Sequence, residues 1–245
     1  MNRSGGRGGH TVRIAHAYGN RRDGIEAAAA ADVDLIEADI WYRAGDIWVR
    51  HERRMQLLPL LFDRRPEGVN NVGPWAFTVF PKHYARLDVD PLRLKGLLER
   101  TRGRRGLLLD VKGDHAEEDA RAYARTLARS LAEARCEESV IVCGQTDVLD
   151  TIREVAPHLD VRYSIEKQWQ WEKLPHRLEA KPGLRGVCVD REFLSDTVAR
   201  FLEEAGLQVF CWTVDDPAEA RRLVGLGVDG IISNSLPLLE QLDGG

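Results

Sequence analysis

The sequence predicts an α/β fold, a single (β/α)8 TIM barrel with a short insertion after its second strand. Short apolar runs alternate with amphipathic helical segments, and this alternation favours a parallel sheet joined by right-handed crossovers. Eight such runs occur in 245 residues, which is the strand number and the usual length of a closed barrel. An open doubly wound sheet is the alternative. Its dinucleotide-binding form lacks its main signal, because no GxGxxG sequence follows the first run.

The predicted strands are short runs rich in Val, Ile, Leu and Phe. Such residues are typical of strands that are buried on both faces of a parallel sheet. In chain order, the runs are residues 11–16, 34–41, 106–112, 139–144, 160–165, 186–190, 208–214 and 230–233.

The predicted helices lie between these strands and have apolar residues at helical spacing. They are residues 24–31, 91–101, 115–134, 148–155, 195–205, 217–226 and 236–242. Residues 166–182, which carry two tryptophans, form either a further helix over one barrel mouth or an irregular connection.

Two parts of the chain break the alternation. The first ten residues are rich in Gly and Arg, and we expect residues 1–10 to be a disordered leader. After the strand-like sequence IWVRH, four prolines and several aromatic residues precede the next helix. Connections of this length are usually functional or mobile. We therefore expect an insertion at about residues 53–90 within one domain that spans residues 11–245.

Composition excludes several classes of protein. The chain has 35 basic and 39 acidic residues and a formal charge of −4, whereas nucleic-acid binders carry clustered positive charge. No apolar run approaches the length of a membrane-spanning helix, and the first residues do not resemble a secretory signal. We therefore expect a cytoplasmic protein without stable membrane insertion. Its four cysteines lack CxxC spacing, so neither a disulfide framework nor a zinc site is favoured.

Three carboxylates are candidates for a metal site. Glu37 and Asp39 alternate within IEADIW, so their side chains emerge on the same face of the strand. Asp110 ends the run LLLD in a comparable position. Buried carboxylates repel one another unless a cation or protons compensate, and three carboxylate oxygens suit Mg²⁺ or Ca²⁺ better than zinc. A structural ion network with Lys112 or Arg13 accounts for the same residues equally well.

Two histidines and a lysine also lie at strand ends, where barrel enzymes place their reacting groups. His16 ends the first strand and His51 ends IWVRH. As a pair, they offer one group that accepts a proton and one that donates it near neutral pH. Lys112 either neutralises a phosphoryl oxygen or pairs with a carboxylate. No serine has the GxSxG sequence of a serine hydrolase.

Taken in order, five segments of residues 12–240 resemble the glycerophosphodiester phosphodiesterase family. That family has HRG at the end of the first strand, then ExD, HD, ExK or DxK, WTV, and finally GVDGIITDxP. The matching segments here are RIAHAYGN, DLIEADIW, WVRHE, LLLDVK and VFCWTVDDPAEARRLVGLGVDGIISNSLPLL.

The resemblance implies a barrel enzyme that hydrolyses a small glycerophosphodiester, or a lysophospholipid-like diester, to glycerol phosphate and an alcohol. It implies that His16 and His51 are the general acid and base. It also implies that Glu37, Asp39 and Asp110 bind a divalent cation, Mg²⁺ or Ca²⁺. The resemblance does not say which histidine has which role.

The resemblance also implies two substrate-binding residues. Lys112 matches a lysine near the phosphate, and Trp212 matches a residue in the wall of the site. The insertion matches in position a segment that caps the pocket. One histidine would deprotonate the attacking hydroxyl, for instance a neighbouring glycerol hydroxyl that gives a cyclic phosphate, and the other would protonate the leaving alkoxide. Water would then open the ring.

The sequence departs from the family pattern at several positions. Ala17 stands where the family has Arg, RRDGIEAA replaces PENT, Glu52 replaces Asp, and Asn234 replaces the Asp of TDxP. Loss of a bidentate guanidinium contact predicts weaker phosphate binding or a different headgroup, unless Arg21 or Arg22 reaches the site.

Two alternatives to the phosphodiesterase therefore stay open. One is a lyase of the sphingomyelinase D type, which releases a cyclic phosphate without hydrolysing it. The other is a non-catalytic binding barrel that keeps the shape and has lost the reaction. The sequence makes no prediction of oligomeric state.

Overall fold

The computed structural model describes residues 10–51, 61–64, 76–80, 83–86, 92–113, 115–144, 147–180 and 183–242. The predicted leader, apart from its last residue, and most of the predicted insertion lie outside these ranges. Glu52 lies outside them as well.

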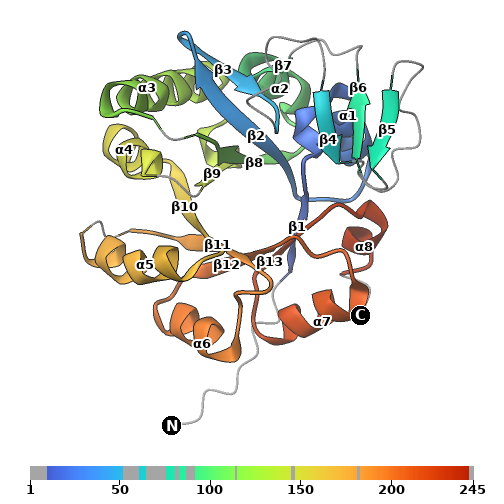
Figure 1. Ribbon diagram of the computed structural model, residues 1–245, viewed down its shortest axis with the longest axis vertical. Coiled ribbons are helices and arrows are strands. Elements are labelled where there is room, and N and C mark those ends of the chain that lie inside the picture. The colour runs from blue at the N-terminus through green and yellow to red at the C-terminus, as the bar shows by residue number, and fades with distance from the viewer. Residues whose placement is uncertain are drawn as a thin grey trace.

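Eight parallel strands of the described chain form a closed barrel (Figure 1), as the sequence predicts. The first strand pairs with both the second and the last, and this double pairing closes the sheet. Around the barrel, the strands are β1 (Val12–Ala15), β2 (Leu35–Arg43), β8 (Gly106–Val111), β9 (Val140–Gly144), β10 (Asp160–Ile165), β11 (Gly186–Asp190), β12 (Gln208–Trp212) and β13 (Gly230–Ser233).

Helices surround the strands and alternate with them along the chain (Figure 1). Residues 168–180 form a helix and not an irregular connection, and a position of this helix over a barrel mouth stays a prediction. The α-helices are α1 (Arg22–Ala30), α2 (Leu94–Thr101), α3 (Glu117–Ala134), α4 (Val148–Val155), α5 (Gln168–Ala180), α6 (Asp196–Glu204), α7 (Pro217–Gly225) and α8 (Leu236–Glu240), and two 3-10 turns are η1 (Tyr18–Asn20) and η2 (Glu137–Ser139).

Three helices begin at residues whose side chains accept a hydrogen bond from the first turn. Ser195 caps α6, Asp216 caps α7 and Ser235 caps α8. Such caps satisfy backbone N–H groups that have no partner within the helix. They fix where these helices start after the loops at the carboxyl ends of β11, β12 and β13.

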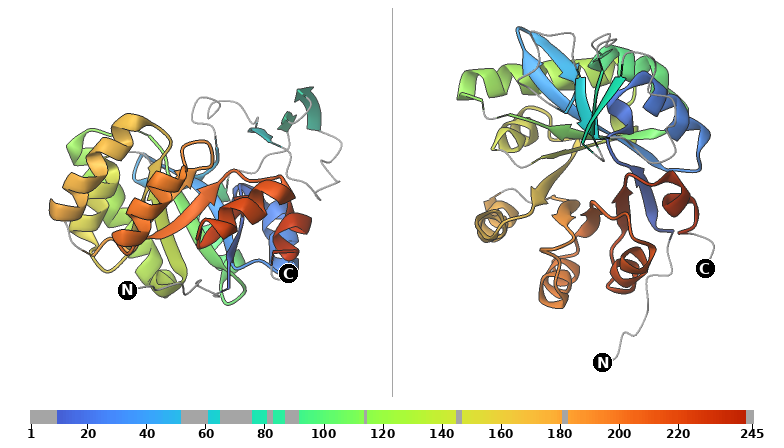
Figure 2. Two further views of the ribbon diagram at one scale, coloured as in Figure 1. Left: turned by 90° about the horizontal axis from the view of Figure 1, so that it is seen from below. Right: turned by 45° about the vertical axis from the view of Figure 1, so that its right-hand side comes forward.

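The connection between β2 and α2 contains additional strands. β3 (Asp46–Val49) pairs antiparallel with β2, and β7 (Leu92–Arg93) pairs antiparallel with β3. A separate antiparallel sheet has the order β4 (Leu61–Arg64), β6 (His83–Arg86), β5 (Ala76–Phe80). This small sheet projects beyond one end of the barrel (Figure 2, left), so the predicted insertion after the second strand includes a sheet of its own.

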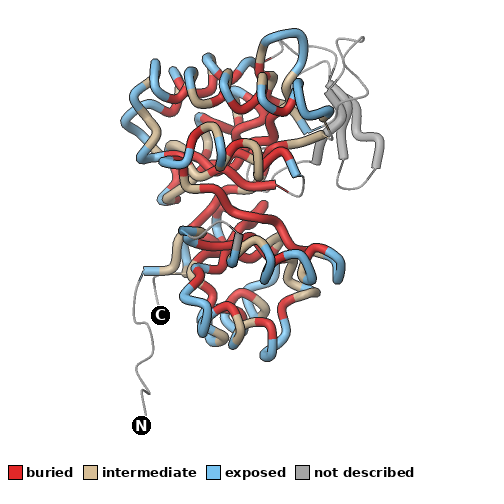
Figure 3. The backbone as a smooth tube through the Cα atoms, turned by 90° about the vertical axis from the view of Figure 1, so that its left-hand side faces the viewer, coloured by how far each residue is buried: buried red, intermediate tan, exposed pale blue. Residues whose placement is uncertain are grey.

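Apolar side chains fill both the space between strands and helices and the centre of the barrel. The barrel interior contains a cluster formed by Ile14, Leu108, Cys143, Cys188, Phe210 and Ile232, all of them buried. Figure 3 shows buried backbone through the middle of the molecule and exposed backbone along the outer faces of the helices. The cluster fills the centre of the barrel, as side chains do in closed eight-stranded barrels.

Among the described residues, no helix has both the length and the apolar character that a membrane crossing requires. The four cysteines are free thiols, and the three in barrel strands are buried.

Candidate active site

Three carboxylates from two neighbouring strands meet at the carboxyl ends of the barrel strands. Glu37 and Asp39 lie on β2, and Asp110 lies on β8, with Asp39 and Asp110 paired in register. One carboxylate oxygen of each residue lies within 4.8 Å of the others. The strand alternation that the sequence predicts therefore brings these three candidate metal ligands together.

Burial and mutual repulsion shift the pKa values of these carboxyl groups. Burial raises the pKa of Glu37 well above its usual value, and the charges of Asp39 and Asp110 raise it further. Burial also raises the pKa of Asp110, although Lys112 opposes this shift. For Asp39, burial is outweighed by the positive charges of Lys112 and His51, which hold its pKa at about 2.

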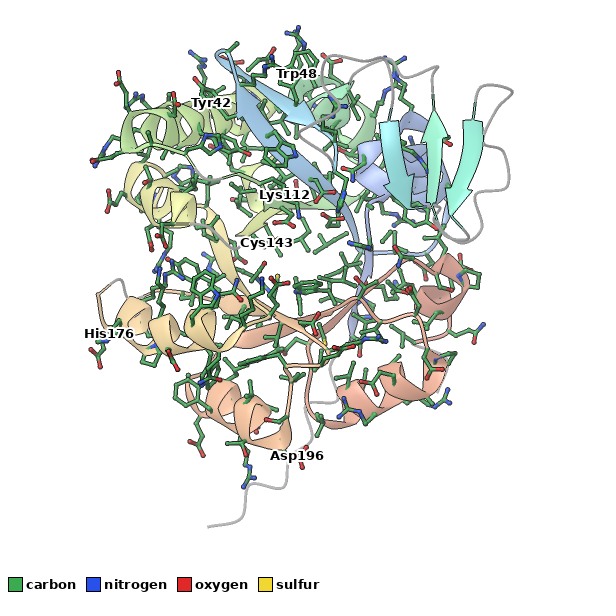
Figure 4. All side chains as sticks on the ribbon, viewed as in Figure 1. Tyr42, Trp48, Lys112, Cys143, His176 and Asp196 are labelled. Atoms are coloured by element: carbon green, nitrogen blue, oxygen red, sulfur yellow. The ribbon has the colours of Figure 1, made fainter. Side chains whose placement is uncertain are left out.

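The ammonium group of Lys112 contacts two of the carboxylates, and Figure 4 labels this residue within the ring of strands. Its Nζ is 2.8 Å from Asp39 Oδ1 and also contacts Asp110 Oδ2. Although burial lowers the pKa of Lys112, these two carboxylates raise it well above its usual value, so the side chain stays charged. The predicted pairing of Lys112 with the carboxylates is present. Arg13 does not contribute to it, because its guanidinium binds Asp32 and Asp34 in the connection that precedes β2.

One ammonium group does not balance three carboxylates, and the remaining charge fits an additional cation. Asp110 Oδ1 is buried and has no hydrogen-bond partner among the described residues. Glu37 has a strongly raised pKa, as expected for a buried carboxylate that lacks a cation. Oxygen donors alone are the ligand set of hard divalent ions such as Mg²⁺ and Ca²⁺.

The turn after β1 holds two of the carboxylates in place. The backbone N–H of Ala17 donates to Glu37 Oε2 over 2.5 Å, and Ala17 has a left-handed φ of 61°. The amide of Asn20 donates to Asp39 Oδ2 over 2.6 Å and accepts from the backbone N–H of Asp39 over 2.9 Å. Gly19 allows this close approach, since a Cβ there would lie 2.5 Å from the Cβ of Ala38.

A chain of hydrogen bonds orients His16. Its Nδ1 lies 2.8 Å from Asn234 Oδ1, while the Nδ2 of Asn234 donates to Asp215 Oδ2 over 2.7 Å. Asp215 also accepts from the backbone N–H of Asn234 and from the hydroxyl of Ser233. Because the amide nitrogen of Asn234 faces Asp215, its oxygen faces the histidine. His16 therefore carries its proton on Nδ1 and presents Nε2 with a free lone pair.

His16 is half-buried, and desolvation lowers its pKa below the ordinary value of 6.5 despite the hydrogen bond to Asn234. The imidazole is therefore neutral near pH 7. The positive charges of Lys112 and His51 lower its pKa further. A neutral imidazole with a free Nε2 is a competent proton acceptor.

The other predicted site residues lie around the same mouth. His51 is exposed, follows β3, and acts electrostatically on both His16 and Asp39. Trp212 ends β12 and packs on the apolar cluster in the barrel. The two arginines considered as replacements for the family Arg differ in exposure. Arg21 is buried with its Nε 3.3 Å from Asp23, and Arg22 is exposed.

Comparison with known proteins identifies the family. A sequence model described as "Glycerophosphoryl diester phosphodiesterase family" matches residues 108–237. The chain belongs to this family. The matched segment contains Asp110, Lys112, Trp212 and Asn234.

Relatives of the glycerophosphoryl diester phosphodiesterase family agree with this assignment. Glycerophosphodiester phosphodiesterase GDPD4 of Arabidopsis thaliana is 25% identical over 243 residues, which cover 92% of this chain and 69% of the relative. The predicted enzyme class, a glycerophosphodiester phosphodiesterase, is therefore confirmed.

Solved structures confirm the family's (β/α)8 fold. A protein from Silicibacter pomeroyi aligns with a TM-score of 0.74 at 19% identity, covering 96% of this chain and 94% of that one. A glycerophosphodiester phosphodiesterase from Parabacteroides distasonis aligns with a TM-score of 0.66 at 17% identity, covering 92% and 94%. A phosphodiesterase from Oleispira antarctica, solved with the product sn-glycerol-3-phosphate, aligns with a TM-score of 0.65 at 15% identity, covering 94% and 95%.

Sequence reasoning missed several residues that act on the site. Asn20, which binds Asp39, was not considered. Its polar side chain in the turn after the first strand is the sequence feature that could have indicated a role in the site. Asn234 was noted only as a departure from the family pattern. Asp215 and Ser233 were not assigned a role, because only the folded barrel shows that Asp215 holds Asn234 against His16.

Proposed function

We propose that this enzyme hydrolyses glycerophosphodiesters, or lysophospholipid-like phosphodiesters, to glycerol phosphate and an alcohol. His16 and His51 would act as base and acid, and Glu37, Asp39 and Asp110 would hold a divalent cation, Mg²⁺ or Ca²⁺. The observation that carries this proposal is the meeting of the three carboxylates beside a neutral histidine at one barrel mouth.

The ligand class has independent support. The structurally similar Oleispira antarctica phosphodiesterase was solved with the product sn-glycerol-3-phosphate. The Lys112 ammonium, together with a cation held by the three carboxylates, would fit the same phosphate chemistry. We infer a small-molecule phosphodiester as substrate and no nucleic-acid partner; the cytoplasmic location stays a prediction.

Charge stabilisation would come from two sources. A divalent cation held by Glu37, Asp39 and Asp110 would offset the negative charge that develops on the phosphoryl oxygens during displacement. The Lys112 ammonium holds Asp39 and Asp110 together and is partly exposed toward the mouth, with 28% of its side chain accessible. It is therefore placed to contact a phosphoryl oxygen as well.

The two histidines differ in surroundings, and the difference supports different roles. His16 is half-buried and neutral with Nε2 free, which suits removal of a proton from the attacking hydroxyl. His51 is exposed at the mouth, where a protonated imidazole can donate to the leaving alkoxide. The attacking hydroxyl is either water or the neighbouring glycerol hydroxyl, which would give a cyclic phosphate that water then opens.

A substrate panel tests this function. Glycerophosphocholine, glycerophosphoethanolamine, glycerophosphoglycerol and a lysophospholipid are incubated with the enzyme and Mg²⁺ or Ca²⁺, and the products are separated by ³¹P NMR. We expect glycerol phosphate from at least one substrate. Accumulation of cyclic phosphate alone would replace the hydrolase by the lyase, and no cleavage of any ester would favour the non-catalytic barrel.

Asn234 is expected to be a positioning residue for His16. Replacing it by Leu removes the acceptor that holds the proton on Nδ1 and lets the ring turn. We expect kcat to fall at least about tenfold, since loss of tautomer control at a catalytic histidine costs between tenfold and 10⁴-fold, while KM changes little. Kinetics from pH 5 to 9 provide the measurement.

The pH profile separates positioning from a general loss of structure. In the wild-type enzyme, the lowered pKa of His16 places the acidic limb of kcat/KM below pH 6.5. Asn234→Leu is expected to change the position of this limb, and Asn234→Asp, which keeps an oxygen facing His16, to recover part of kcat. An Asn234→Leu enzyme with unchanged kcat and an unchanged profile would contradict this role.

A further inference from the structure

A second cavity lies at the opposite end of the barrel from the candidate active site. It has a volume of about 530 Å³ and is formed by the connections that precede β2, β8 and β9. Four arginines and one carboxylate line it: Arg102, Arg104, Arg105, Arg135 and Asp34. Cavities of a few hundred Å³ hold small molecules, and this lining is strongly positive.

The carboxyl ends of nearby helices explain why some of these arginines lie here. Helices α1, α2 and α3 end around the cavity, and cations are stabilised near helix carboxyl ends. Arg102 donates to the carbonyl of Ala134 over 3.0 Å, and Arg105 donates to the carbonyl of Ala31 over 2.7 Å. Each of these two contacts satisfies the hydrogen-bonding capacity of one guanidinium nitrogen, Nη2, of Arg102 or Arg105.

Arg104 is also paired, because its Nη1 donates to Glu26 Oε2 over 2.9 Å. The donors of Arg105 Nε and of the Arg135 side chain have no such explanation. Nε of Arg105 is buried without a hydrogen-bond partner among the described residues. The exposed side chain of Arg135 likewise forms no hydrogen bond or ion pair with any residue that the structure describes. Asp34 does not neutralise them, because its carboxylate is bound to Arg13 and His10. A buried donor without an acceptor is unfavourable. A ligand with several acceptor oxygens would therefore stabilise this arrangement of arginines.

We propose that this cavity binds the phosphoryl group of a small phosphorylated molecule. Arg105 would donate its free Nε–H, and Arg135 would contact the remaining oxygens. Guanidinium groups match phosphate oxygens in both geometry and charge. The site is separate from the carboxylate cluster, so its occupation needs neither a divalent cation nor the proposed reaction.

The probe is pyrophosphate, titrated calorimetrically into the full chain in the presence of a chelator. We expect saturable binding of about one pyrophosphate per chain. Arg105→Gln and Arg135→Gln should each weaken it by about tenfold or more, as expected for loss of a charge-assisted hydrogen bond. Arg129→Gln is the matched control, because it removes the same charge from an exposed position of α3.

A Lys112→Ala variant distinguishes this cavity from the barrel mouth, and its pyrophosphate affinity should equal that of the wild type. If Arg105→Gln does not fold, Arg135→Gln, at an exposed position, carries the test. The proposal is overturned if the wild type shows no saturable binding up to about 10 mM. It is also overturned if Arg129→Gln weakens binding as much as Arg135→Gln, or if only Lys112→Ala weakens it.

Discussion

Replacing His16 by Ala is expected to lower kcat by about 10²- to 10⁴-fold, the usual contribution of a positioned acid or base. The imidazole is neutral near pH 7, and the chain from Asp215 through Asn234 leaves its Nε2 free to accept a proton. His51→Ala should give a loss of similar size. Initial rates on the preferred phosphodiester provide the measurement.

Two controls accompany this experiment. His16→Ala leaves Asn234 Oδ1 buried without its donor, which costs about 1–3 kcal/mol, so far-UV circular dichroism and thermal unfolding must show that the variant is folded. His158→Ala is a matched variant, since His158 is an exposed histidine that faces Glu137 outside the site, and it should keep full activity. Retained turnover in both His16→Ala and His51→Ala would refute the proposed acid–base pair.

Removing divalent cations with a chelator is expected to lower the rate at least about 100-fold, since a catalytic cation supplies several kcal/mol of charge stabilisation. Adding back Mg²⁺ or Ca²⁺ should restore activity. It should also raise the melting temperature, because an ion at 100 times its Kd stabilises the folded state by about 2.7 kcal/mol. The relief of repulsion among Glu37, Asp39 and Asp110 is the physical reason for both effects.

Two substitutions test whether the effect of the cation depends on the carboxylate cluster. Asp110→Asn removes a charge from the cluster and should abolish both the reactivation and the rise in melting temperature. Asp32→Asn removes a charge from an exposed carboxylate that binds Arg13, and it should respond to cations as the wild type does. An enzyme that stays fully active in chelator would show that Lys112 alone balances the carboxylates and that no cation takes part.

The sequence predicted the barrel because the patterns that indicate strands and helices lie within short segments of the chain. The eight strands are short segments rich in apolar residues between turns, and the helices carry their own periodicity. The insertion was predicted only as an irregular segment. Its strand order depends on pairing between residues far apart in the chain, as when Leu61 lies opposite Arg86.

The same distinction applies to the site. Alternation within IEADIW placed Glu37 and Asp39 on one face, and the order of the strands placed Asp110 beside them. The hydrogen bond between His16 and Asn234 joins residues 218 positions apart and depends on how the first and last strands pair. No local pattern contains that information, so Asn234 could be seen only as a departure from the family pattern.

The pairing of β1 with both β2 and β13 has a consequence for synthesis on the ribosome. A nascent chain can bring Glu37, Asp39 and Asp110 together once β8 has emerged, since these residues come from adjacent strands. It cannot orient His16 until β13 and the residue after it have been translated, because the acceptor is Asn234. The carboxylate cluster therefore requires only the first half of the chain, whereas an oriented proton acceptor requires nearly all of it.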